Sequence, residues 1–177
     1  MKKRKAIILW TTLSVLLIAV FAIVILSRPV AVTPENLKTG DIYQLRNLEW
    51  GMSLKAVNQI WTKKLQPDPG AAAVPDLPKN ETVYISKKGS VFDGVSADIL
   101  FYFRDDKLYQ IAFTFPDTVD GDWLDTQLTA LSGLGGTEDF VSESIVGTTY
   151  KWSLGNTYMV FLLTKTQKTA QLAIGTN

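Results

Sequence analysis

Twenty-one residues from Ala6 to Leu26 contain no charged side chain, which sets this stretch apart from the rest of the chain. As a helix rising about 1.5 Å per residue it reaches roughly 31 Å, which matches a hydrocarbon core of about 30 Å. Its N-terminal side carries four basic residues, Lys2, Lys3, Arg4 and Lys5, whereas only Arg28 follows closely. The positive-inside rule therefore predicts a single-pass protein of the cell membrane, with a cytoplasmic N-terminus and residues 28–177 outside.

A cleaved signal peptide is the main alternative for this stretch. The apolar region of a signal peptide usually spans about 7 to 15 residues and ends in a small-x-small cleavage site. Here the run is longer, and the sequence Ser27-Arg28-Pro29-Val30-Ala31 is a poor cleavage site. The sequence thus favours an uncleaved anchor. A lipid-modified cysteine is excluded, since the chain has no cysteine.

The remaining chain is predicted to form one domain. Residues 1–27 form a basic tip and the anchor, residues 28–41 mix prolines with small polar residues as a linker, and residues 42–177 form the domain. The first 27 residues hold four of the 18 basic residues and none of the 17 acidic ones, so residues 28–177 carry a net charge of −3. This charge argues against nucleic acid as a partner.

The chain also has no histidine. The usual general base near neutral pH, the Ser-His and Cys-His nucleophile pairs and the commonest zinc ligand are therefore missing. We expect a protein that is not an enzyme and holds no cofactor and no metal.

Apolar spacing predicts an α+β fold. A helix over Leu54–Leu65 and a second one beginning after Asp120 have helical spacing, and six segments alternate as strands do. The predicted strands are Thr82–Ser86, Val95–Phe103, Leu108–Phe115, Thr148–Leu154, Thr157–Thr164 and Thr169–Ile174. The order is a helix followed by three strands, occurring twice. We therefore expect an antiparallel sheet with two helices on one face, after an N-terminal transmembrane helix.

Local signals mark the ends of these elements. Ser53 and Asp120 are typical N-cap residues, and glycines follow the second helix. Asp105-Asp106 and Gly155-Asn156 predict two-residue hairpin turns. Because Ile111 and Leu108 have opposite parity, we expect either a bulge near Tyr109-Gln110 or a three-residue turn.

The segment Leu48-Glu49-Trp50-Gly51-Met52-Ser53, with Val57 four residues on, precedes Ile99-Leu100-Phe101-Tyr102-Phe103 and Asp105-Asp106-Lys107-Leu108. This pattern resembles small bacterial exported domains, namely the beta-lactamase-inhibitor-protein-like fold and the small outer-membrane assembly lipoproteins. It covers about residues 45–115, with a loose repeat to residue 174. The chain lacks the lipidated cysteine of the lipoproteins and the disulfide cysteines of the inhibitor. The resemblance implies a non-catalytic binding or assembly module of a bacterial envelope.

Tryptophans are the candidate binding residues. Trp61 and Trp152 have core-facing parity and are expected in the core. Trp50 and Trp123 lie at helix starts, where their rings are freer to be exposed. We therefore predict that Trp50 and Trp123 belong to a binding surface.

Four aspartates between Asp117 and Asp125 invite a calcium interpretation. Their spacing does not match the EF-hand template. Acidic residues at a helix N-terminus are instead explained by the cap and the helix dipole. Ser86-Lys87-Lys88-Gly89 lacks the Ser-x-x-Lys spacing of a serine nucleophile and is expected to be a turn.

Two long loops, residues 66–80 and 133–146, occupy equivalent places in the two halves. Such loops carry either a binding surface or disorder, and the sequence does not separate these alternatives.

These observations predict a membrane-anchored, extracytoplasmic, non-catalytic binding or assembly module of the cell envelope. Its partner would be an envelope protein, a peptide or a wall component. The alternative is a hydrolase of envelope glycans that uses two carboxylates, and a third possibility is a structural spacer without a ligand.

Overall fold

The largest element of this protein is one antiparallel sheet of eight strands, in the order β3-β4-β5-β6-β10-β9-β8-β7. The structure is a computed structural model that describes residues 31–177 apart from residues 62, 72–76, 118, 137 and 165–168. The strands of the large sheet are β3 (Gln66–Pro67), β4 (Glu81–Val91), β5 (Val95–Arg104), β6 (Lys107–Thr114), β7 (Phe140–Glu143), β8 (Gly147–Leu154), β9 (Thr157–Thr164) and β10 (Ala170–Thr176). The other elements are the 3-10 helix η1 (Pro34–Leu37), the small sheet of β1 (Lys38–Thr39) and β2 (Ile42–Tyr43), and the helices α2 (Leu54–Ile60) and α3 (Gly121–Gly135).

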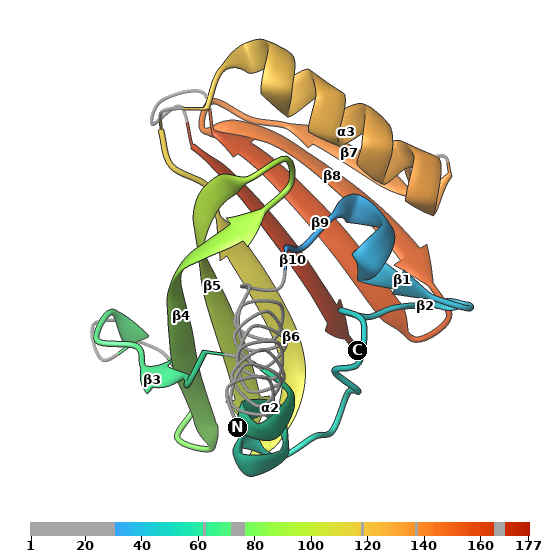
Figure 1. The fold of residues 1–177 in the computed structure, drawn as a ribbon. Helices are drawn as coiled ribbons and strands as arrows, with labels where there is room; N and C mark the ends of the chain where they lie inside the picture. Colours follow the sequence, from blue (N-terminus) through green and yellow to red (C-terminus); the bar gives the residue numbers. More distant parts are fainter. Residues whose placement is uncertain (1–30, 62, 72–76, 118, 137, 165–168) are drawn as a thin grey trace, which may run out of the picture.

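The sheet consists of two halves of four strands each. Strands β3 to β6 follow α2, strands β7 to β10 follow α3, and the halves meet where β6 pairs with β10. Both helices, η1 and the small sheet lie over the same face of the sheet (Figure 1). The C-terminal strand β10 therefore lies in the middle of the sheet.

The predicted fold class is wrong. The chain forms mainly a large antiparallel sheet of eight strands with two α-helices in the part that the structure describes, and not two units of one helix and three strands. The additional strands, β3 and β7, lie in the two stretches that we expected to be irregular loops. Both are short strands at the sheet edges, with 2 and 4 residues. Their pairing depends on the neighbouring strand and leaves no alternating pattern in the sequence.

The predicted membrane topology also requires correction. Within the described residues, no helix has the length and apolarity needed to cross a membrane. The longest one, α3, has 15 residues and reaches roughly 22 Å, which is less than a hydrocarbon core of about 30 Å. The predicted anchor, Ala6–Leu26, lies outside the described residues. The predicted single-pass anchor and the extracytoplasmic location that depends on it are therefore not supported.

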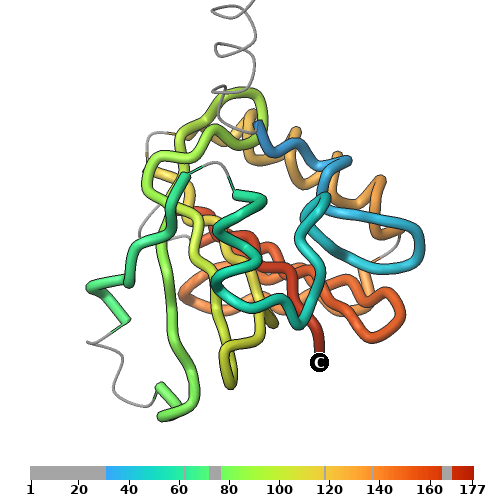
Figure 2. The backbone as a smooth tube through the Cα atoms, turned by 60° about the horizontal axis from the view of Figure 1, so that its bottom comes forward, coloured from blue at the N-terminus to red at the C-terminus, as the bar shows by residue number. Residues whose placement is uncertain are grey.

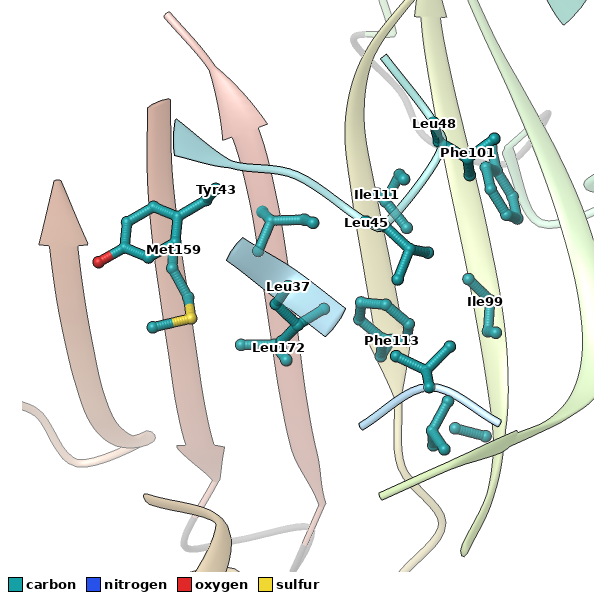
Figure 3. Close-up of a cluster of buried hydrophobic side chains, with 14 of the residues drawn as sticks. Leu37, Tyr43, Leu45, Leu48, Ile99, Phe101, Ile111, Phe113, Met159 and Leu172 are labelled. Atoms are coloured by element: carbon teal, nitrogen blue, oxygen red, sulfur yellow. The ribbon is translucent and has the colours of Figure 1, made fainter. Parts of the chain in front are cut away.

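The hydrophobic core lies between the sheet and the elements that cover it. Side chains from residues 37–48 pack on those of β5, β6, β9 and β10 (Figure 3). The labelled members of this cluster are Leu37, Tyr43, Leu45, Leu48, Ile99, Phe101, Ile111, Phe113, Met159 and Leu172, all of them buried. Each such side chain contributes about 1.5–3 kcal/mol when it is fully buried. Part of the segment predicted as a linker thus belongs to the core, because Leu37 is completely buried.

The local signals at element ends are confirmed. The Ser53 hydroxyl accepts a hydrogen bond from the Ala56 N–H, and the Asp120 carboxylate accepts one from the Trp123 N–H. Asp105 and Asp106 have φ angles of 51° and 59°, as a two-residue hairpin turn with a type I′ backbone requires. Gly155 has a φ of 60° in the other predicted turn. The expected bulge is present, since β5 and β6 shift register between Tyr102 and Phe103.

Candidate functional site: polar and aromatic residues on the open face

One face of the large sheet is turned away from the elements that cover the core, and we call it the open face. Paired positions place Ile85, Leu100, Ala112, Ala173 and Val160 in one row across five strands of this face. Apart from Ile85, which is buried, these side chains are half-buried. In the part of the chain that the structure describes, both α-helices pack on the other face (Figure 1). The open face is therefore an apolar, partly accessible surface built on strands.

A second row on the open face is aromatic and polar. Tyr102 pairs with Gln110, Gln110 with Gly175, and Gly175 with Tyr158. The Tyr158 hydroxyl donates a hydrogen bond to Gln110 Oε1 over 2.7 Å. Its ring passes over Gly175, where an added Cβ would lie 2.5 Å from the Tyr158 hydroxyl. Glycine at position 175 is thus what lets Tyr158 lie flat across β10 and reach β6.

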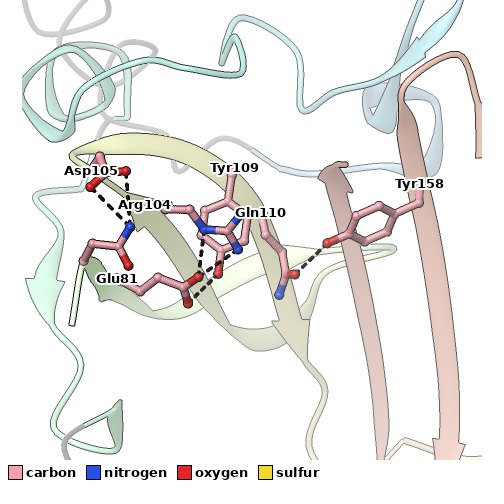
Figure 4. Close-up of polar contacts among 7 residues, drawn as sticks. Glu81, Arg104, Asp105, Tyr109, Gln110 and Tyr158 are labelled. Carbon is pink, nitrogen blue, oxygen red and sulfur yellow. Dashed lines mark hydrogen bonds and ion pairs between the residues drawn. The ribbon is translucent and has the colours of Figure 1, made fainter. Parts of the chain in front are cut away.

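A buried carboxylate organises the next position along the sheet. Glu81 accepts hydrogen bonds from Arg104 Nε over 2.9 Å and from the Tyr109 hydroxyl over 2.9 Å, and a second Arg104 nitrogen lies 2.8 Å from its Oε1 (Figure 4). The Glu81 side chain is 7% exposed, whereas that of Arg104 is 55% exposed. The Arg104 guanidinium carbon also lies 4.5 Å from the centre of the Tyr109 ring. Glu81 therefore fixes both partners while the guanidinium stays accessible.

The β-bulge explains how Tyr109 joins this group. Phe103 pairs with Leu108 and Tyr102 pairs with Gln110, so Tyr109 is the extra residue on β6. A bulge re-aims the side chain of its extra residue. Tyr109 then contacts Tyr102 with the ring centres 6.3 Å apart in an edge-to-face arrangement. We call Glu81, Tyr102, Arg104, Tyr109, Gln110 and Tyr158 together the tyrosine cluster.

The surroundings raise the pKa of all three tyrosines. Burial, a hydrogen bond to Glu81 and the charge of Glu81 raise the pKa of Tyr109 to about 12. Burial, with a smaller contribution from Asp68, raises the pKa of Tyr102. Burial also raises the pKa of Tyr158, against the opposing charge of Arg104. The cluster therefore offers neutral hydroxyls, flat aromatic rings and one accessible cation.

These groups suit recognition better than catalysis. Both carboxylate oxygens of Glu81 already accept hydrogen bonds, so Glu81 is poorly placed to act as a free acid or nucleophile. The described residues contain no group of three or more acidic side chains that could hold a metal ion. A pocket near α2 is lined by Leu45, Arg46, Asn47, Leu48, Ile60 and Trp61, none of which is a carboxylate. The glycan hydrolase stays a prediction that no observation favours.

The two tryptophans predicted for a binding surface lie on different elements. Trp50 is half-buried before α2, and its Nε1 donates a hydrogen bond to the Tyr43 carbonyl over 2.8 Å. Trp123 is half-buried in the first turn of α3, with its ring centre 5.2 Å from that of Phe115. Both pack against the core, and neither belongs to the tyrosine cluster. Trp61 and Trp152 are buried in the core, as predicted.

The sequence contained a partial signal for the tyrosine cluster. Tyr102, Tyr158 and Val160 occupy the parity opposite to the core residues of their strands, and this parity is readable from the sequence. The partners Glu81 and Arg104 stand opposite each other across β4 and β5. Their pairing requires the strand register, and the predicted first strand began at Thr82, one residue after Glu81. The tyrosine cluster could therefore not be predicted without the strand register.

Comparisons with protein-family models, with curated proteins and with solved structures found no match. The resemblance to the inhibitor-like fold and to the assembly lipoproteins stays a prediction.

Proposed function

We propose that the described domain is a non-catalytic protein-binding module that contacts its partner through the open face of the sheet. The observation that carries this proposal is the tyrosine cluster with its apolar row beside it. Tyrosine and arginine are enriched among the residues that dominate binding energy at interfaces. The binding or assembly role implied by the resemblance agrees with this proposal and does not identify the partner.

The arrangement of the cluster favours tight recognition. Its side chains extend from β-strands, and the hydrogen bonds among Glu81, Arg104 and Tyr109 fix their rotamers before binding. Side chains that are already ordered lose less conformational entropy when a partner docks. The 55% exposed Arg104 supplies a positive charge for a carbonyl or carboxylate on the partner.

Site-specific photocrosslinking in cells tests this function with the full chain. The crosslinking residue replaces exposed Ser153, which pairs with Tyr158, or exposed Lys107, which pairs with Arg104. Exposed Lys55 on α2 is the matched control position. We expect a discrete adduct with a second protein from the open-face positions and none from Lys55.

Substitutions in the cluster sharpen this experiment. Tyr102→Ala and Tyr158→Ala should each lower adduct yield at least about tenfold, since an interface hot spot contributes about 2 kcal/mol or more. Ile60→Ala, which changes an exposed apolar residue on α2, should leave the yield unchanged. An adduct that survives both tyrosine substitutions in folded protein, or no discrete adduct from either open-face position, would refute the proposed surface.

A further inference from the structure

The two edges of the large sheet are built differently. At one edge, β3 has two residues, includes Pro67 and is followed by Pro69, so it offers little backbone to another strand. At the other edge, β7 has four residues without proline or a basic residue, and its Phe140 and Val141 are 53% and 51% exposed. A free edge with exposed apolar side chains is a template for strand pairing. Among the described residues, the β7 edge therefore combines unblocked backbone groups with exposed apolar side chains, which the β3 edge does not.

The turn after β7 adds to this apolar surface. Ile145 is 92% exposed and Val146 is 54% exposed. The Ser144 hydroxyl accepts hydrogen bonds from the Val146 and Gly147 N–H groups, each over 3.2 Å. Gly147 lies so close to β9 that an added Cβ would be 2.0 Å from the Leu163 carbonyl oxygen. The hairpin is therefore held firmly while its apolar tip remains exposed.

The hydrogen-bond pattern shows which backbone groups of β7 point outward. The Ser144 N–H donates to the Gly147 carbonyl over 2.9 Å, in the same register in which β7 pairs with β8. Hydrogen-bonded pairs alternate along an antiparallel ladder, so Ser142 bonds inward to Thr149. Val141 and Glu143 then direct their N–H and C=O groups away from β8. These are the groups that an added strand would bond.

Charge argues against a second copy of this chain as the added strand. Glu138, Asp139 and Glu143 flank the apolar residues of β7. Antiparallel self-pairing with Val141 opposite its own counterpart sets Asp139 against Glu143, and pairing centred on Glu143 sets two glutamates together. The intermediate register places Val141 against Glu143. The first two registers place like charges opposite each other, which is destabilising, and the third places a glutamate opposite an apolar side chain without a basic partner.

We propose that the free edge of β7 binds an extended segment of another protein as an additional antiparallel strand. The segment carries an apolar residue opposite Val141 and a basic residue opposite Glu143, two positions away. A second basic residue lies near the Asp139 carboxylate, just before β7, where the Asp139 N–H bonds inward to the Lys151 carbonyl over 2.9 Å. Opposite Phe140 the segment carries a further apolar residue. This recognition mode takes affinity from main-chain hydrogen bonds and specificity from the alternating side chains. The site is separate from the tyrosine cluster and goes beyond the proposed function.

Peptide binding to the full-length chain, followed by fluorescence anisotropy, tests this proposal. The probe is a labelled peptide with the core sequence Lys-Thr-Val-Leu-Lys, and its control has glutamate in place of both lysines. We expect saturable binding of the lysine peptide and at least about tenfold weaker binding of the glutamate peptide. Glu143→Lys should abolish most of this preference, because each peptide then faces one like charge and one opposite charge. Equal affinity for both peptides, or no saturable binding up to about 1 mM, would overturn the proposal.

Two further comparisons isolate the backbone contribution. Val141→Pro removes an outward N–H and should weaken binding at least about tenfold relative to Val141→Ala, which keeps it. N-methylation of the central valine of the peptide should cause a similar loss without changing the protein. Unchanged binding of the N-methylated peptide would contradict strand addition. Sedimentation experiments test whether a second copy occupies this edge. A dimer that dissociates in Val141→Pro would identify a second copy as the occupant and would also overturn the proposal.

Discussion

At the scale of single residues, burial and then Glu81 raise the pKa of Tyr109. Burial is the largest cause. The Glu81 carboxylate also accepts a hydrogen bond from the Tyr109 hydroxyl and would repel a negative tyrosinate, and together these effects raise the pKa to about 12. Glu81→Gln removes the charge and keeps the shape. We expect this variant to have a lower Tyr109 pKa than the wild type, although burial still holds it above the ordinary value. Tyrosine titration by NMR or ultraviolet absorbance, with Tyr109→Phe to assign the signal, measures this change.

The same shift predicts how stability depends on pH. The folded protein holds the Tyr109 proton more tightly than the unfolded chain, whose tyrosine pKa is about 10. Stability from this group is therefore fully present below pH about 10 and is lost as the pH rises towards 12. Urea unfolding of the wild type should show a steeper loss over this range than unfolding of Tyr109→Phe. Equal slopes would show that Tyr109 is not perturbed in the folded protein.

Glycine is predicted to be required at position 175, because the Tyr158 ring lies directly over it. An alanine methyl group at this position would lie 2.5 Å from the Tyr158 hydroxyl and 3.0 Å from the Tyr109 carbonyl oxygen. Gly175→Ala should displace Tyr158 from Gln110 and cost about 1–3 kcal/mol of unfolding free energy. Gly133→Ala is the matched control, because Gly133 lies in α3 with open space at its Cβ. This control should be neutral or stabilising by up to about 1 kcal/mol in the same urea titration.

At the scale of elements, capping of α3 explains the aspartates between Asp117 and Asp125 better than calcium binding does. Asp120 Oδ1 accepts from the Trp123 N–H over 2.7 Å. Asp120→Ala should therefore destabilise the protein by about 1 kcal/mol, whereas Asp120→Asn should retain most of the cap. Asp125→Ala, an exposed change later in α3, should have a smaller effect. If calcium raises the melting temperature of the wild type and not of Asp120→Ala, capping alone does not explain the aspartates.

The elements that sequence predicts well are those whose signals are local. Ser53 and Asp120 mark helix starts, and the two-residue turns mark the hairpins, because these residues satisfy backbone groups within a few positions. The predicted strand ended at Ser86, whereas β4 continues to Val91 through a register shift after Ser86, where Lys88 adopts a φ of 53°. The shift interrupts the alternating pattern, so the pattern did not predict the second part of the strand. The edge strands and the Glu81 to Arg104 pairing depend on register between distant segments. No local pattern contains that information.

At the scale of the whole molecule, the two halves of the sheet are predicted to unfold together. The segment before α2 crosses both, since Val32 bonds to β4, Tyr43 to Thr157 of β9, and Gly51 to Leu108 of β6 (Figure 2). The halves also share a seam where β6 pairs with β10, and Leu172 of that seam is completely buried. Neither half therefore has a core that is closed without the other.

Leu172→Ala tests this cooperativity. Removing a fully buried leucine side chain costs about 2–5 kcal/mol, and the loss should appear in both halves because the seam belongs to both. Native-state hydrogen exchange should show the amides of β5 and of β9 losing protection by the same free energy. The exposed substitution Ile60→Ala should change neither set by more than about 0.5 kcal/mol. If β9 loses protection while β5 keeps it, the halves are separate folding units, and the tyrosine cluster, which draws side chains from both, would be only as ordered as the weaker half.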